Sequence, residues 1–85
     1  MSNLEVERLP AAFKAEIAAL YASATLSGKI PDGRRAYLLG AVARLRSKYN
    51  AKIVSLRKAY PASVVDFAEQ SIVRIENQHA ATLAA

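Results

Sequence analysis

Apolar residues in the middle of the chain recur at every third or fourth position, as they do on one face of an α-helix. Between residues 33 and 60 the pattern meets no proline, and Gly40 is the only glycine inside it. The spacing is close to an 11-residue repeat, which keeps an apolar stripe on one side of a long, nearly straight helix. We therefore predict a helix over residues 33–60. Its apolar seam consists of Leu38, Val42, Leu45, Tyr49, Ile53, Leu56 and Tyr60.

The same repeat can be followed past Pro61, because Val64 and Phe67 fall on the continuation of the seam. A proline, however, disfavours helical angles in the residue before it. Two arrangements remain: a break followed by a separate helix over residues 62–82, or one kinked, continuous helix. We prefer the break.

The separate C-terminal helix has a start signal and an inner face of its own. Ser63 and Asp66 have the spacing of a capping box, in which two side chains bond to free backbone N–H groups. Its expected inner face consists of Val65, Ala68, Ile72 and Ile75.

Residues 4–26 also follow helical spacing. Their apolar face consists of Leu9, Phe13, Ile17, Leu20 and Ala24. Pro10 suits the first turn of a helix, so we expect a break or a helix start near it. Gly28 can take the positive φ that ends a helix. Asp32 is placed to act as the N-cap of the central helix.

These patterns predict an all-α fold, a helical hairpin plus a third helix, similar to a three-helix bundle. A chain of 85 residues has a marginal core, and the absence of cysteine excludes disulfides. The central seam is also longer than residues 10–26 can cover alone. We therefore expect one domain over residues 1–85, completed by homo-oligomerisation.

The net charge of +5 is distributed unevenly. Residues 34–60 contain eight lysines and arginines and no acid, whereas residues 1–33 and 61–85 are mildly acidic. Around the helix axis the cations form two rows, one at each edge of the seam. The arginine row consists of Arg35, Arg46 and Arg57, and the mixed row of Arg44, Lys48 and Lys52.

We expect the arginine row to line a helix–helix interface, facing Glu5, Glu16 or Glu69. The mixed row has two interpretations. Its long side chains either cover the rim of the seam while their charges reach water, or they bind an anionic partner. The candidate residues for binding a partner or nucleic acid are Arg34, Tyr37, Arg44, Lys48, Lys52 and Lys58.

No set of residues has the pattern of a catalytic or metal site, since His79 is the only histidine and cysteine is absent. We expect no catalytic residue, no metal, no cofactor and no small-molecule substrate. The seam is needed for the core, so we do not expect membrane binding, and no targeting segment is visible, so we expect a cytoplasmic protein. We predict a small, non-enzymatic regulator or inhibitor that binds another protein through a helical face. The alternative is a nucleic-acid-binding protein that uses residues 34–58.

Overall fold

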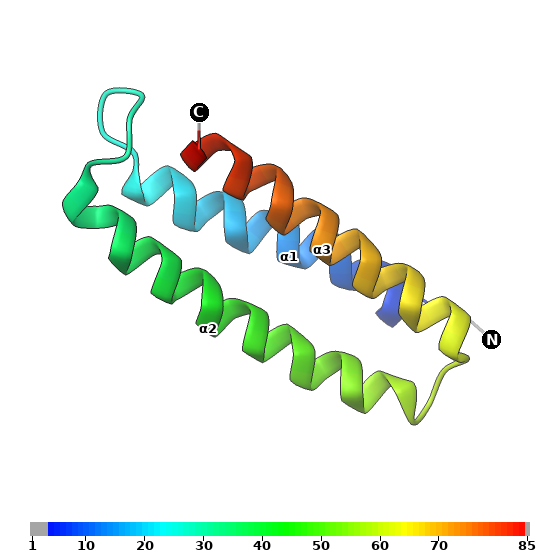
Figure 1. Ribbon diagram of the computed structural model, residues 1–85. Coiled ribbons are helices and arrows are strands. Elements are labelled where there is room, and N and C mark those ends of the chain that lie inside the picture. The colour runs from blue at the N-terminus through cyan, green and yellow to red at the C-terminus, as the bar shows by residue number, and fades with distance from the viewer. Residues whose placement is uncertain (1–3, 85) are drawn as a thin grey trace.

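The computed structural model describes residues 4–84, which form three long helices (Figure 1). Helix α1 spans Leu4–Ala24, α2 spans Asp32–Arg57 and α3 spans Ala62–Ala84. Helix α2 runs antiparallel to α1 and α3 (Figure 1). The helices form an elongated bundle with dimensions of 46 × 18 × 17 Å. The predicted all-α, three-helix fold is confirmed.

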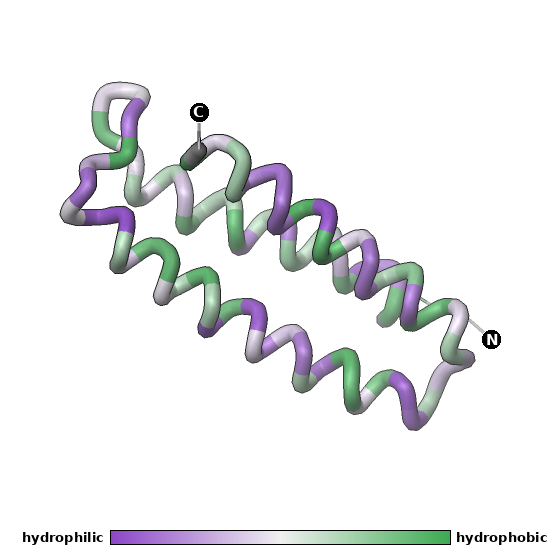
Figure 2. Tube along the Cα trace, in the orientation of Figure 1, coloured by the Kyte–Doolittle hydropathy of each residue, from purple (hydrophilic) through white to green (hydrophobic). Residues whose placement is uncertain are grey.

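The core runs along the whole bundle and takes side chains from every helix. Figure 2 shows hydrophobic positions recurring along all three helices. The six seam residues from Leu38 to Leu56 are buried, with exposed fractions of 1–9%, and Tyr60 is half-buried. They pack against Val6, Leu9, Phe13, Ile17, Tyr21 and Ala24 of α1 and against Val65, Ala68 and Ile72 of α3. The predicted seam is thus the α2 contribution to the core.

Two helices of the same chain cover the seam, because α1 and α3 both pack against α2. The expectation of self-association rests on a stretch of seam that the first helix alone would leave uncovered. The structure removes that reason, since α3 supplies the missing cover. Self-association stays a prediction, but the seam no longer supports it.

Pro10 lies inside α1, where the sequence predicts a break or a helix start. The proline has no N–H to bond the carbonyl group of Val6, and an interior proline costs about 3 kcal/mol. Val6, Leu9 and Phe13 lie on both sides of it and are buried. Full burial of each such side chain contributes about 1.5–3 kcal/mol. Tertiary packing therefore outweighs the local cost, and the helix continues through Pro10.

The connection between α1 and α2 is a short hairpin, which differs from the predicted helix end at Gly28. Leu26 and Lys29 exchange two backbone hydrogen bonds, with N–O distances of 2.6 and 3.0 Å. Ser27 and Gly28 between them both have positive φ, at 52° and 79°. This is the geometry of a type I′ turn, which glycine favours. Gly28 therefore forms the turn, and the helix ends four residues earlier, at Ala24.

Helix α2 begins at Asp32, one residue earlier than predicted, and Pro31, not Asp32, occupies the N-cap position, without a side-chain cap. The fixed φ of proline suits an extended residue before a helix, here with φ −60° and ψ 147°. The Asp32 carboxylate still lies in the first turn, where the helix dipole favours a negative charge.

The chain breaks before Pro61 as predicted, and the continuous kinked helix is excluded. Helix α2 ends at Arg57, and α3 begins at Ala62 and runs back along the bundle. The 11-residue repeat therefore does not predict burial after the break. Phe67, which would continue the repeat, is 71% exposed.

The capping box predicted at the start of α3 does not describe its actual contacts. Ser63 is the second residue of the helix. Asp66 instead accepts a hydrogen bond from Arg57, with an N–O distance of 2.7 Å. The predicted inner face is confirmed for Val65, Ala68 and Ile72, and Ile75 is half-buried.

The burial pattern predicts how single substitutions change stability. Leu45→Ala and Leu56→Ala each remove a buried side chain and should lower the free energy of unfolding by about 2–5 kcal/mol. Arg44→Ala changes an exposed residue one position from Leu45 and should stay within about 0.5 kcal/mol. Urea denaturation followed by circular dichroism measures all three. An arginine variant as damaged as the leucine variants would contradict this register of α2.

Candidate functional site

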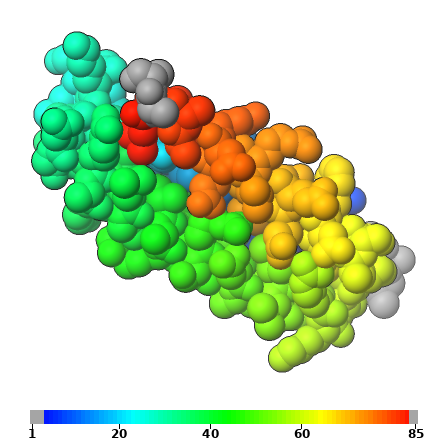
Figure 3. Space-filling model, viewed as in Figure 1, coloured from blue at the N-terminus to red at the C-terminus, as the bar shows by residue number. Residues whose placement is uncertain are grey.

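Two members of the arginine row, Arg46 and Arg57, pair with acidic side chains of α3. Arg46 Nε lies 2.8 Å from a carboxylate oxygen of Glu76. Arg57 contacts both Asp66, at 2.7 Å, and Glu69, at 3.1 Å. Side chains of α2 and α3 close over α1 on this side of the molecule (Figure 3). The predicted interface is thus confirmed for Arg46 and Arg57, and of the three expected acids only Glu69 is a partner.

The mixed row lies on the other edge of α2, next to α1. Two adjoining hollows lie on the surface between these two helices. One has a volume of about 350 Å³ and the other about 490 Å³. Leu20, Tyr37 and Ala41 line both, so the two hollows form one continuous depression, which we call the α1/α2 groove. Its polar side chains are Glu16, Ser23, Arg34, Tyr37, Arg44 and Lys48.

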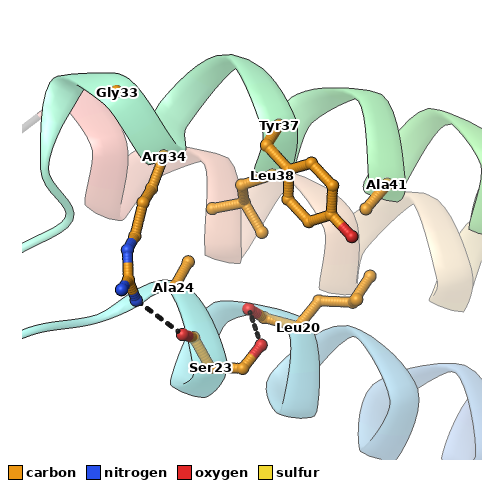
Figure 4. A pocket seen from close by; sticks show the side chains of 8 residues that line it. All are labelled: Leu20, Ser23, Ala24, Gly33, Arg34, Tyr37, Leu38 and Ala41. Carbon is orange, nitrogen blue, oxygen red and sulfur yellow. Dashed lines mark hydrogen bonds between the residues drawn. The ribbon is translucent and has the colours of Figure 1, made fainter.

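Arg34 reaches from the first turn of α2 toward the end of α1, whereas the Tyr37 ring lies along α2 between Leu38 and Ala41 (Figure 4). The Arg34 guanidinium donates a hydrogen bond to the carbonyl oxygen of Ser23, at 3.2 Å, and so bridges this end of the groove. Tyr37 is 74% exposed, although it is a large aromatic residue on the wall of a hollow. Tyr37 is not part of the core. The next residue, Leu38, is buried there instead.

A cluster around Glu16 forms the other end of the groove. The Glu16 carboxylate accepts a hydrogen bond from the Tyr49 hydroxyl and lies 3.2 Å from the Lys48 ammonium group. Tyr49 is buried and packs edge-on against the Phe13 ring, with 5.1 Å between centroids. Glu16 therefore links the charged rim of the groove to the core.

The same contacts change the acidities of this cluster. The hydrogen bond from Tyr49 lowers the pKa of Glu16, and Lys48 acts in the same direction. Burial, together with the nearby Glu16 carboxylate, raises the pKa of Tyr49 to about 12. Both shifts favour a negative Glu16 and a neutral Tyr49 at neutral pH.

The structure brings four of the six candidate binding residues together in the groove: Arg34, Tyr37, Arg44 and Lys48. Lys52 lies beyond the Glu16 cluster, beside the Tyr49 ring and in a separate hollow of about 490 Å³. Lys58 occupies the C-cap of α2 and lines neither hollow.

Two residues on α1 complete this surface, and sequence reasoning did not place them there. Arg8 adds a cation beside Lys52. Glu16, which we expected opposite the arginine row, pairs with the mixed row instead. Helical spacing assigns both residues to the rim of α1, but the handedness of the bundle determines which edge of α2 they meet.

The charges on the two sides of α2 are therefore unequal. On the α2–α3 side, three acids, Asp66, Glu69 and Glu76, equal the three arginines in number and pair with two of them, Arg46 and Arg57. On the α1–α2 side, only Glu5 and Glu16 oppose Arg8, Arg34, Arg44, Lys48 and Lys52. The side chain of Arg44 has no hydrogen bond or ion pair within residues 4–84. Most of the net positive charge thus gathers along the groove and its continuation.

His79 has a structural environment near the end of α3. Its Nδ1 lies 3.0 Å from the carbonyl oxygen of Ile75, and its ring packs against Tyr21 with 5.0 Å between centroids. Within residues 4–84, no group of acidic or histidine side chains is arranged to hold a metal ion.

None of the three helices, over the residues described, combines the length and the apolar composition needed to cross a membrane.

The chain matches no protein-family model, and no curated protein or solved structure matches it. Its function is therefore inferred from the groove itself.

The lowered pKa of Glu16 predicts a contribution to stability that depends on pH. A carboxyl group with a lowered pKa in the folded state stabilises the fold above its ordinary pKa of 4.5, and this contribution disappears as the pH falls through the lowered value. Glu16→Gln should therefore lose less stability than the wild type between pH 7 and pH 3. Urea denaturation at both pH values measures the difference. Equal losses would show that the Glu16 cluster does not stabilise the fold.

Proposed function

We propose that this protein is a small, non-enzymatic interaction protein that binds another protein through the α1/α2 groove. The observation that carries the proposal is the combination of exposed Tyr37, an apolar floor and a cationic rim in one depression. Protein–protein interfaces commonly have this composition, with an apolar centre, a polar rim, and tyrosine and arginine as the residues that contribute most affinity.

The floor of the groove favours a protein over a nucleic acid. Leu20 and Ala41 are half-buried and line the groove, so they can contact apolar side chains of a partner protein. The phosphate backbone of a nucleic acid has no such apolar groups.

Because cations outnumber acids along the groove, a nucleic acid is the alternative partner. The salt dependence of binding distinguishes it from a protein. Phosphate contacts release counterions, so binding to a nucleic acid weakens steeply as salt rises. Binding to a protein through the apolar floor depends less on salt, since only the rim is electrostatic.

A pair of matched double variants tests the proposal. Arg44→Gln/Lys48→Gln removes two groove cations, and Lys14→Gln/Arg74→Gln removes two exposed cations elsewhere. Each double variant lowers the net charge equally. Because lost surface pairs cost little, about 0–1 kcal/mol, both should stay folded.

The measurement is affinity capture from an extract of the source organism, with and without nuclease treatment. The groove variant should lose a protein partner that the wild type and the control variant retain, and nuclease should not release it. A partner that nuclease releases would support nucleic-acid binding. Equal capture by both variants would exclude the groove as the binding site.

A further inference from the structure

We infer that the occupant of the α1/α2 groove is an acidic amphipathic helix of the partner protein, an inference that rests on the proposed function. A helix that lies along the groove would contact α1 and α2 together and become a fourth helix of the bundle. Amphipathic helices bind in apolar grooves in this manner, through side chains that repeat every three or four residues.

The shape of the groove fits a helix because its walls present short side chains. Ala19 on α1 and Ala41 on α2 both line the depression, with the half-buried Leu20 between the walls. Short side chains let helix axes approach to about 8–10 Å, the usual spacing of packed helices. Arg34 to Lys48 is a distance of about 21 Å along α2, which corresponds to about four turns of a bound helix.

The charge of the rim indicates which residues the occupant carries. The α2 wall has Arg34, Arg44 and Lys48, whereas the α1 wall offers Glu16 alone, already paired with Lys48. The occupant should therefore place carboxylates along the edge that faces α2. Arg44 and Lys48 are one helical turn apart, so two acids at a spacing of three or four residues would meet them.

The apolar anchor of the occupant should lie beside Tyr37. This side chain stands between Arg34 and Arg44 along α2, and Leu20 lies across the groove from it. A large apolar side chain between Tyr37 and Leu20 would cover both. The expected motif is thus a large apolar residue on one face and two or three acids along one neighbouring edge.

A selection experiment tests the motif even though the partner is unidentified. The probe is a phage-displayed library of 18-residue helices whose positions vary among Glu, Gln, Lys, Leu, Phe and Ala. It is selected on the wild-type chain and counter-selected on Arg44→Gln/Lys48→Gln. We expect enrichment of helices with an apolar stripe and glutamates along one edge. Enrichment of neutral or basic helices, or no enrichment, would overturn the inference.

The best selected peptide then allows a charge exchange. Replacing its glutamates with glutamine should weaken binding about tenfold or more, as should Arg44→Gln/Lys48→Gln, measured by fluorescence anisotropy. Replacing glutamate with lysine in the peptide should restore part of the affinity for Arg44→Glu. Amide chemical shifts should change at Ala19, Tyr37 and Arg44. Shifts confined to another face would contradict the inference.

Other occupants and the proposed function give distinguishable results. If a 20-nucleotide single strand displaces the selected peptide at physiological salt, the occupant is a nucleic acid and both proposals fail. If sedimentation shows a wild-type dimer that Arg44→Gln/Lys48→Gln abolishes, a second copy fills the groove and the inference fails. If capture of a protein still depends on the groove but no acidic helix is selected, the inference alone fails.

Discussion

The structure depends on the burial of the α2 seam between two helices of the same chain. The seam carries cations along both edges, so any helix that covers it must also lie beside positive charge. Helix α3 meets this requirement with acids at Asp66, Glu69 and Glu76, which pair with two arginines. Helix α1 meets it with Glu16, which pairs with Lys48 and Tyr49, and otherwise with short side chains such as Ala19. The two interfaces of α2 therefore differ in charge, because acids pair with two arginines beside α3 but are outnumbered by cations beside α1.

The candidate site is a consequence of that difference. Asp66, Glu69 and Glu76 of α3 pair with Arg46 and Arg57 of α2, whereas Ala19 and Ala41 line a hollow between α1 and α2. The cations at this interface lie at the rim of the hollow. A surface with apolar, aromatic and cationic groups therefore arises from ordinary bundle packing in which cations outnumber acids at one interface.

Local spacing and backbone geometry predict the seam, most of the inner face of α3 and the break before Pro61, and the structure confirms all three. The prediction at Pro10 is wrong, since the cost of the proline is local while the burial that offsets it comes from other helices. The alternative of a continuous helix, in which Phe67 would extend the seam, is excluded because the chain reverses at Pro61. The partner of Glu16 could not be predicted, because spacing does not give the handedness of the bundle.

Glu16 connects the core of the bundle with the rim of the groove. Its carboxylate is fixed by the hydroxyl group of Tyr49, a buried residue whose ring packs against Phe13. The same carboxylate holds the Lys48 ammonium group at the rim. Glu16 therefore positions Lys48 at the rim in the absence of a partner. Arg44, in contrast, has no side-chain partner within residues 4–84, so its charge is free to respond to a ligand. A fixed lysine one turn from a free arginine gives the groove both a preformed edge and an adaptable contact.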